Sequence, residues 1–242
     1  MTVLAIDIGN SRIKWGCHDR GRWVDLGFAD HDAAPALASA WARLPRPAHA
    51  IGSNVAAASV ARNLGGLLEA HGIPVRWISS KPTQCGVRNR YLEPSQLGTD
   101  RWAALIAARA MHRGACVVVA AGTAVTVDAL SADGDFLGGL ILPGLSLMSA
   151  ALARDTARLP RDPGIYTGFP TATADAIATG VVDAVAGAVE RFACRLRERA
   201  GMPVTLIGTG GAIGSVAPHL AHDVRVVENL VLEGLLIIAA EA

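Results

Sequence analysis

A short polar segment near the start of the chain combines an acid, an amide, a hydroxyl and a lysine directly after an apolar run. It reads Asp7-Ile8-Gly9-Asn10-Ser11-Arg12-Ile13-Lys14. Glycine lets the backbone approach a ligand closely, N–H and hydroxyl donors suit phosphate oxygens, and a carboxylate suits Mg²⁺. The segment therefore predicts a site for a nucleotide phosphate tail with its metal. An ordinary hairpin with an Asn-Ser turn is the structural alternative.

Two later glycine-containing segments indicate further contacts with a nucleotide. Gly122-Thr123-Ala124-Val125-Thr126-Val127-Asp128 offers backbone N–H groups and a hydroxyl to anionic oxygens. Leu206-Ile207-Gly208-Thr209-Gly210-Gly211-Ala212 approaches the dinucleotide fingerprint, but Ile213 occupies the position of its third glycine. A flat glycine surface beneath a nucleoside is the functional interpretation of this last segment, and an ordinary tight turn is its alternative.

The elements that must position these segments recur along the chain. Val3–Gly9 is expected to be a buried strand that leads through Asn10-Ser11 into a second strand. The same order of strand, glycine turn and strand returns at Cys116–Ala121 and Val125–Leu130. Two like units about half a chain apart predict a duplicated architecture in which both turns approach one ligand.

Strands and helices alternate between and after these units, which indicates an α/β protein. The other segments expected to be strands are Ala50–Ser53, Val75–Ser79, Gly138–Pro143 and Val204–Ile207. The segments expected to be helices are Asp32–Leu44, Ala56–His71, Arg101–Arg113, Leu145–Ala153, Thr173–Ala200 and Leu230–Ala240. No long Pro, Gly or Ser linker separates the halves, so we place a boundary near Gly114, between residues 1–114 and 115–242.

The composition excludes several classes of protein. Hydrophobic residues make up 51% of the 242 residues and charged residues 18%, which rules out a disordered chain. The 22 basic and 21 acidic residues leave a net charge of +1, so neither nucleic acid nor a membrane is an expected partner. No apolar stretch reaches the ~20 residues of a spanning helix, and the start of the chain lacks a signal-peptide pattern. These features predict a cytoplasmic protein.

Lysine is nearly absent from the chain, and this singles out one position. Of the 22 basic residues only Lys14 and Lys81 are lysines, and the others are arginines. The compact ammonium of Lys14, inside the polar segment, suits contact with phosphate as a point charge. The four cysteines are widely spaced and form no metal or disulfide pattern, so we interpret them as buried apolar residues.

The order of the motifs resembles that of a known superfamily. Strands followed by Asp-x-Gly-Asn-Ser, by Gly-Thr and by Gly-Thr-Gly-Gly resemble the two phosphate motifs and the adenosine motif of actin, sugar kinases and heat-shock ATPases. Within this superfamily the chain resembles type III pantothenate kinase, also known as Bvg accessory factor, over nearly its whole length. The residues that carry this resemblance are Asp7–Trp15, Gly98-Thr99-Asp100-Arg101, Gly122–Asp128 and Gly138–Gly144. It implies a duplicated actin-like (ribonuclease H-like) ATPase fold with two similar halves.

The resemblance also implies a role for each matching residue. Asp7 would hold Mg²⁺ through water, and the catalytic residue Asp100 would contact the hydroxyl that receives the phosphoryl group. Contacts with ATP and its phosphates are implied for Asp7, Gly9, Asn10, Ser11, Lys14, Thr123, Ala124 and Gly210. Contacts with pantothenate are implied for Tyr91, Gly98, Thr99, Asp100, Arg101 and Thr173, although Ala172 stands where the family often has asparagine. Asp128 matches the acid that binds a monovalent cation, K⁺ or NH₄⁺, in some members.

The resemblance thus implies ATP-dependent phosphorylation of pantothenate to 4′-phosphopantothenate, the first step of coenzyme A biosynthesis, by a homodimer. Phosphoryl transfer depends on positioning and charge neutralisation more than on early deprotonation. Asp100, with an ordinary aspartate pKa of ~3.9, would therefore orient the hydroxyl and accept its proton late. Capping of the following helix by Asp100 is compatible with this role. The alternatives are a nucleotide-binding regulatory protein without turnover and a kinase of another small alcohol.

Overall fold

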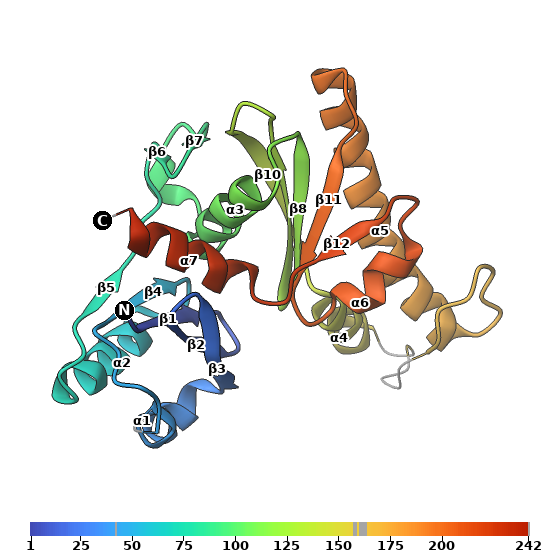
Figure 1. Cartoon of the computed structure of the whole chain (residues 1–242). Helices are drawn as coiled ribbons and strands as arrows, with labels where there is room; N and C mark the ends of the chain where they lie inside the picture. Colours follow the sequence, from blue (N-terminus) through green and yellow to red (C-terminus); the bar gives the residue numbers. More distant parts are fainter. Residues whose placement is uncertain (42, 157–158, 160–163, 242) are drawn as a thin grey trace. The chain divides into compact units, whose positions relative to one another are not determined.

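The computed structural model describes residues 1–41, 43–156, 159 and 164–241, and the chain forms two compact units (Figure 1). Unit 1 comprises Met1–Met111 together with Asn229–Ala242, and unit 2 comprises His112–Glu228. Each unit is built around strands that form a mixed sheet, and each has its own apolar core.

The sheet of unit 1 has the strand order β3-β2-β1-β4-β5. β1 (Val3–Ile8) pairs antiparallel with β2 (Ile13–Asp19) and parallel with β4 (His49–Asn54). β3 (Arg22–Ala29) pairs antiparallel with β2, and β5 (Val75–Trp77) pairs parallel with β4. The central strand β1 is buried over most of its length, which explains its nearly continuous apolar sequence.

One face of this sheet carries an apolar core beneath two helices, α1 (Ala34–Trp41) and α2 (Ala58–Ala70). Trp15 on β2 and Trp41 on α1 meet in this core, edge to face, with ring centroids 6.2 Å apart. Large aromatic side chains at this contact bury much apolar surface and so fix α1 against the sheet.

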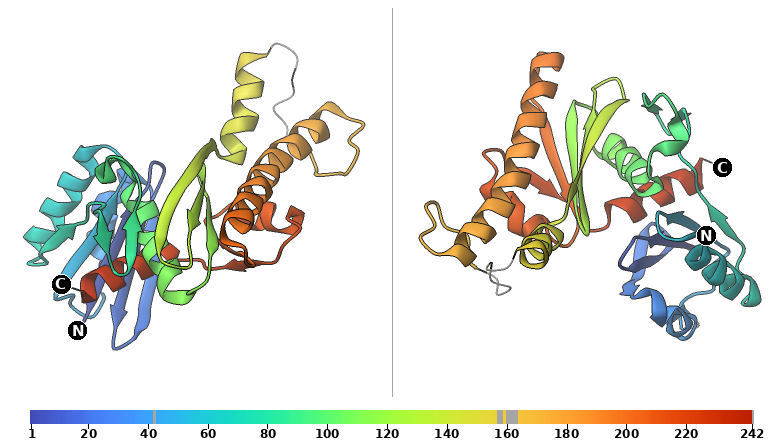
Figure 2. Two further views of the ribbon diagram at one scale, coloured as in Figure 1. Left: turned by 90° about the horizontal axis from the view of Figure 1, so that it is seen from above. Right: turned by 180° about the vertical axis from the view of Figure 1, so that it is seen from behind.

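Two helices far apart in the chain, α3 (Thr99–Met111) and α7 (Leu230–Ala240), lie side by side in unit 1 (Figures 1 and 2). They pack against β1 and β4. The two helices approach closely at Gly234, where a side chain would collide with the backbone of Ala103. A glycine in the middle of α7 is therefore required by packing rather than by backbone conformation.

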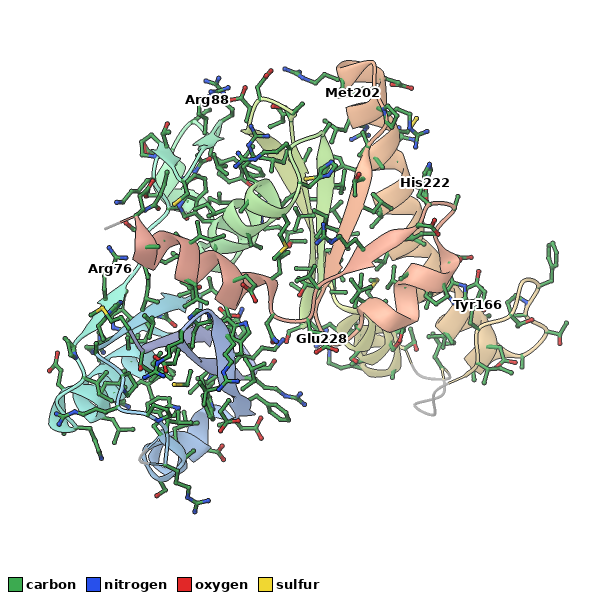
Figure 3. The ribbon with its side chains drawn as sticks, viewed as in Figure 1. Arg76, Arg88, Tyr166, Met202, His222 and Glu228 are labelled. Atoms are coloured by element: carbon green, nitrogen blue, oxygen red, sulfur yellow. The ribbon has the colours of Figure 1, made fainter. Side chains whose placement is uncertain are left out.

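Side chains from the sheet hold α7 in place. Trp23 on β3 donates its Nε1–H to Glu233 at 2.7 Å. Arg76 on β5 donates to the carbonyl of Ile238 at 3.0 Å, near the end of α7 (Figure 3). Because cations near a helix C-terminus also interact favourably with the helix dipole, the contact made by Arg76 stabilises this docking.

Between β5 and α3, unit 1 contains a small hairpin of β6 (Thr83–Gln84) and β7 (Val87–Asn89). Cys85 and Gly86 connect the two strands with positive φ angles of 48° and 78°. Positive φ at both central residues is what a type I′ hairpin turn requires. The 3-10 helix Pro94–Gln96 then leads into α3.

Unit 2 repeats the topology of unit 1, with strands in the order β12-β11-β8-β9-β10. They are β8 (Cys116–Ala121), β9 (Ala124–Leu130), β10 (Asp135–Pro143), β11 (Thr205–Thr209) and β12 (Val224–Val226). β9 lies antiparallel between β8 and β10, and β11 lies parallel between β8 and β12. With β8 in the place of β1, the order and directions match those of unit 1, which confirms the predicted α/β fold with two similar halves.

The sheet of unit 2 packs against α5 (Thr173–Ala200), a helix of 28 residues (Figure 2). Val185 and Val189 of α5 are fully buried in this core. The helix ends at Gly201, whose φ of 61° is left-handed, a common way for a helix to stop. The other helices of unit 2 are α4 (Leu145–Asp155), α6 (Ile213–Val216) and the 3-10 turn Ala217–His219.

Most expected elements are present, with shifted ends. The predicted helix Asp32–Leu44 corresponds to a 3-10 turn followed by α1, and Ala42 lies outside the described residues. Helix α3 begins at Thr99 instead of Arg101. Four strands, β3, β6, β7 and β12, were not predicted. β6 and β7 are too short to show alternation, and β3 and β12 are mostly exposed edge strands.

The division of the chain differs from the predicted one at its C-terminal end. The expected boundary near Gly114 lies close to the division after Met111, but α7 belongs to unit 1 and not to the second half. The reason is the contact between α7 and α3, which joins the last helix of the chain to the first unit. No described helix is long and apolar enough to cross a membrane.

The close contact between α3 and α7 gives a test by substitution. Alanine normally stabilises a helix interior by up to about 1 kcal/mol relative to glycine. Gly234→Ala should instead lower the stability by about 1–3 kcal/mol, because its methyl group collides with the backbone of Ala103. Gly187→Ala in α5, where a Cβ meets nothing within 4 Å, is the matched control and should stabilise the protein. Urea unfolding measures the stability of both variants. Equal changes in the free energy of unfolding would contradict the close packing of α7 on α3.

Candidate active site

Three polar side chains form a row across neighbouring strands of unit 1. Asp7 on β1 pairs in register with Lys14 on β2 and with Ser53 on β4. Directly paired residues point to the same face of a sheet, so the three side chains are neighbours. The row lies next to the end of β1, where the polar turn begins, and ligands of sheets of this kind bind at the carboxyl ends of the strands.

Asp7 is half-buried, with its Oδ1 atom fully buried, and the charge of its carboxylate is only partly compensated. Its Oδ1 atom has no hydrogen-bond partner among the described residues. Burial, and then the negative charge of Asp100, raise the pKa of Asp7 from 3.8 to about 7. Lys14 and a hydrogen bond from Ser53 lower this pKa, but by less. A buried carboxylate oxygen without a donor fits a hard cation such as Mg²⁺.

Asp100 lies in the first turn of α3, close enough to Asp7 for their charges to interact. Its Oδ1 accepts a hydrogen bond from the backbone N–H of Arg101 at 2.7 Å. Gly98 leaves room for the carboxylate, because a Cβ at Gly98 would lie 2.6 Å from this oxygen. Burial raises the pKa of Asp100, and the amide and charge of Arg101 lower it. The expectation of an ordinary pKa is therefore wrong, because the sequence did not show the burial.

Arg101, which follows Asp100 in α3, contacts Tyr91. Arg101 is only 6% exposed, and it donates from Nη1 to the hydroxyl of Tyr91 at 3.2 Å. The guanidinium carbon also lies 5.8 Å from the centre of the Tyr91 ring, which is within cation–π range. The backbone N–H of Tyr91 is held by Asn89 Oδ1 at 3.1 Å. The structure thus brings Tyr91, Asp100 and Arg101 together, as the resemblance implied.

The turn between β1 and β2 presents polar groups to solvent. The N–H of Gly9 donates to the carbonyl of Arg12 at 3.0 Å, which closes the turn. His31 contacts the carbonyl of Gly9 at 2.8 Å through Nε2, and this contact requires the proton on Nε2. Asn10 and Ser11 are exposed at the tip of the turn.

The glycine-containing turns of unit 2 pack backbone against backbone. The N–H of Gly144 donates to the carbonyl of Thr123 at 2.9 Å, and that of Ala212 donates to the carbonyl of Ala121 at 3.0 Å. A side chain at Gly144 would collide with the carbonyl of Thr123. A side chain at Gly210, whose φ is 95°, would collide with the backbone of Ala121. The Gly-Thr turn and the Gly-Thr-Gly-Gly turn are therefore neighbours in unit 2.

Asp128 and Thr173 have different surroundings in unit 2. Asp128 is 2% exposed on β9. Thr126 lies two residues earlier on the same face of that strand, and its Oγ1 is buried without a partner among the described residues. Thr173 begins α5 and lines a cavity of about 710 Å³ within unit 2. The lining of this cavity is mostly apolar, from α4 and α5.

Sequence reasoning missed two residues at the end of β4. Ser53 is fully buried, and its Oγ lies 2.9 Å from Oγ1 of Thr99. The backbone N–H of Asn54 donates to the same Thr99 oxygen at 3.2 Å. A signal was present, because a polar pair ends a short apolar strand, and the ends of parallel neighbours meet at one edge of a sheet.

Comparison with known proteins identifies the family. The family model described as type III pantothenate kinase matches residues 3–195. The chain belongs to the type III pantothenate kinase family. The type III pantothenate kinase of Nitrosospira multiformis is 47% identical over 239 residues, which cover 99% of this chain and 91% of that protein.

Solved structures show how widely this fold is shared. A Campylobacter jejuni protein described as a Baf family transcriptional activator has a TM-score of 0.63 and 24% identity, and the match covers 98% of both chains. A Sinorhizobium meliloti protein described as a 2-dehydro-3-deoxygalactonokinase has a TM-score of 0.62 and 16% identity, over 99% of this chain and 98% of that one. The fold of this type III pantothenate kinase family member is that of the actin-like ATPases and sugar kinases.

The raised pKa of Asp7 predicts a dependence of stability on pH. Its pKa of about 7 in the folded chain exceeds the ordinary 3.8, so stability falls as the pH rises from about 4 to 7. Asp7→Asn removes the buried charge. In metal-free buffer it should raise the stability at pH 8 by an amount on the order of 3 kcal/mol, and the gain should vanish near pH 4.

Thermal unfolding at pH 4 and at pH 8 measures this gain in stability. Asp133→Asn, in an exposed turn, is the control and should leave the unfolding midpoint unchanged. If Asp7→Asn gave no gain at pH 8, the carboxylate would not be an uncompensated buried charge.

Proposed function

We propose that this chain transfers the γ-phosphoryl group of ATP to the primary hydroxyl of pantothenate, in the cytoplasm, as the first step of coenzyme A biosynthesis. Membership of the type III pantothenate kinase family supports this reaction. The observation that carries it is the pair of half-buried carboxylates in unit 1, Asp7 and Asp100, which are close enough for their charges to interact. The carboxylate of Asp7 can bind a metal ion, and that of Asp100 can orient the hydroxyl that attacks the phosphorus.

Contacts with the phosphate tail of ATP are proposed for backbone and polar side-chain groups. In unit 1 the exposed Asn10 and Ser11, with Gly9 and Lys14 beside them, offer donors and one positive charge. In unit 2 we assign Thr123, Ala124 and Gly210 to the nucleotide. The close packing of the two glycine-containing turns of unit 2 supports this assignment, because it presents backbone groups without side chains between them.

The residues present fit Mg²⁺. Asp7 would hold the ion, through water, with its buried and unpartnered Oδ1. Among the described residues, no three His, Cys, Asp or Glu side chains form a metal-ligand group. Mg²⁺ typically takes one or two carboxylates and completes its shell with water and phosphate oxygens. When bound, the ion would neutralise charge on the phosphate oxygens.

Asp100 is proposed to orient the primary hydroxyl of pantothenate and to accept its proton. The hydroxyl oxygen forms a bond to the γ-phosphorus, the bond from that phosphorus to the bridging oxygen of ADP breaks, and the proton passes to the carboxylate. Burial raises the pKa of Asp100, which makes the carboxylate a better proton acceptor late in the reaction. The bond from the Arg101 amide fixes the carboxylate orientation.

Contacts with pantothenate are proposed for Tyr91, Gly98, Thr99 and Arg101 in unit 1, and for Thr173 in unit 2. Arg101 is buried and positively charged, which suits the carboxylate of pantothenate. Tyr91 holds the guanidinium by a hydrogen bond and by its ring. The absence of a Cβ at Gly98 keeps the space beside Asp100 open.

Asp128 is proposed to hold a monovalent cation, K⁺ or NH₄⁺. Its carboxylate is buried on β9, and the buried Oγ1 of Thr126 lies on the same face of the strand. Oxygen atoms of this kind suit a hard cation. The proposal is tested by replacing K⁺ with Na⁺ in the assay below, since a lower rate is expected without K⁺ or NH₄⁺.

The proposed reaction is tested by a coupled assay of ADP release over a panel of small alcohols that includes pantothenate. Pantothenate should be the substrate with the highest kcat/KM, because the pocket offers a buried guanidinium to its carboxylate. Release with a sugar but not with pantothenate would indicate a kinase of another alcohol. Tight nucleotide binding without release from any alcohol would favour a regulatory protein.

The role of Asp100 is tested by Asp100→Asn, which keeps the size of the side chain and removes its charge and basicity. We expect kcat to fall about 10²–10⁴-fold, as for a positioned acid–base group, with nucleotide affinity little changed. Circular dichroism and nucleotide titration are the controls for folding. A folded variant with wild-type kcat would reduce Asp100 to a structural residue at the start of α3.

A homodimer is proposed because α4 leaves apolar side chains exposed beside the cavity that Thr173 lines. Leu147 is 48% and Leu152 is 38% exposed. Light scattering over a dilution series should give a dimeric mass, and Leu147→Glu should shift it toward the monomer and lower the activity. Met202→Glu, at the end of α5, is the control and should leave the mass unchanged. A monomer with full specific activity would reject the dimer.

A further inference from the structure

Ser53 lies between the two elements that carry the proposed reaction. Its side chain is fully buried at the end of β4, and it pairs in register with Asp7 on β1. Its Oγ lies 2.9 Å from Oγ1 of Thr99, the first residue of α3. One buried hydroxyl therefore lies beside the proposed metal-binding acid in the sheet and contacts the first residue of the helix turn that carries Asp100.

The direction of these hydrogen bonds follows from counting protons. The Ser53 hydroxyl has one proton, and it donates to the carboxylate of Asp7, which has no proton to offer when ionised. Between Ser53 and Thr99, the donor must then be Thr99. The oxygen of Thr99 in turn accepts from the backbone N–H of Asn54 at 3.2 Å. The contact from Thr99 to the carbonyl of Asn54 is longer, at 3.4 Å, so it competes poorly for the Thr99 proton.

We propose that Ser53 is a positioning residue that, through Thr99, fixes the carboxylate of Asp7 for the metal ion relative to the first turn of α3. This inference rests on the proposed function, because it needs a metal ion at Asp7 and a reacting hydroxyl at Asp100. The chain of donors runs from the Asn54 amide through Thr99 and Ser53 to Asp7. A hydrogen bond to one part of the carboxylate leaves its unpartnered Oδ1 for the ion and its water.

The same row explains why a hydroxyl is needed at this position. Ser53 is 0% exposed, so water does not replace its hydrogen bond when the hydroxyl is removed. Loss of the hydroxyl would leave the carboxylate free to rotate, and Thr99 would keep only its contacts with the backbone of Asn54. Residues that orient a metal ligand in this way commonly change metal affinity or activity by about 10–100-fold when they are substituted.

The direct test measures metal binding without turnover. Mn²⁺ is used as the probe for the Mg²⁺ site, with a non-hydrolysable ATP analogue and no pantothenate, and free Mn²⁺ is measured by electron paramagnetic resonance. Ser53→Ala should weaken Mn²⁺ binding about 10-fold. Ser53→Thr, which retains the hydroxyl, should recover most of this affinity. In the ADP-release assay, Ser53→Ala should lower kcat more than it raises the KM for pantothenate.

A second variant tests the relay from its other end. Thr99→Val keeps the shape of the side chain and removes its hydroxyl, and it should weaken Mn²⁺ binding in the same direction as Ser53→Ala. Because both variants break one chain of hydrogen bonds, the double variant should lose little more than either single variant. Additive losses would show that the two residues act separately, and would contradict the proposal.

Ser80→Ala is the matched control in the same unit. Ser80 is also a buried serine, and its hydroxyl donates to the carbonyl of Leu97 at 2.7 Å, so its loss has a similar cost for folding. It should leave Mn²⁺ affinity and kcat unchanged. Equal Mn²⁺ affinity in Ser53→Ala and Ser80→Ala would overturn the proposal. If pantothenate were not the substrate, the Mn²⁺ measurement would be unaffected, so the two failures can be told apart.

Discussion

The site in unit 1 depends on two partly desolvated carboxylates whose charges are not fully compensated. Asp7 and Asp100 both lose hydration, and the charge of Asp100 raises the pKa of Asp7 further. Burying an ionised group without full pairing is unfavourable for folding, so the apolar core of the unit must offset this cost. An acid with a raised pKa of this kind is typical of a functional site. At such a site, a bound cation or the proton of a reacting group compensates the negative charge that the fold leaves unpaired. Three neighbouring residues reduce the cost of this uncompensated charge without removing it. Lys14 and Ser53 lower the pKa of Asp7, and Arg101 lowers the pKa of Asp100.

The duplicated topology shows that the charged row of unit 1 has an uncharged counterpart in unit 2. Each central strand has an equivalent position, the penultimate residue, which pairs with one antiparallel and one parallel neighbour. The resulting rows are Lys14, Asp7 and Ser53 in unit 1, and Thr126, Ala120 and Thr209 in unit 2. The same backbone therefore carries a charged row in one unit and an uncharged row in the other. This asymmetry supports the proposal that the metal ion is held in unit 1.

Much of the fold could be predicted from the sequence, and the site only in part. The repeat of strand, glycine turn and strand indicated the duplication, because local patterns of this kind survive in a single sequence. The place of α7 could not be predicted, since its contact with α3 joins segments from opposite ends of the chain. Asp100 was found through its motif, but its raised pKa depends on burial that only the tertiary structure shows. Ser53 was not predicted for the same reason. Only the tertiary structure shows its register with Asp7 and its contact with Thr99.

The account is tested most directly by the ionisation of Asp7 itself. Carbon-13 NMR of the protein labelled at aspartate carboxyl carbons, with Asp7→Asn used to assign the resonance, follows this group alone as the pH changes. In the metal-free protein the Asp7 resonance should titrate with a pKa near the value of about 7, and Mg²⁺ with a non-hydrolysable ATP analogue should move the titration to lower pH. An Asp7 resonance that titrates in the ordinary aspartate range, and does not respond to Mg²⁺ and nucleotide, would contradict the account.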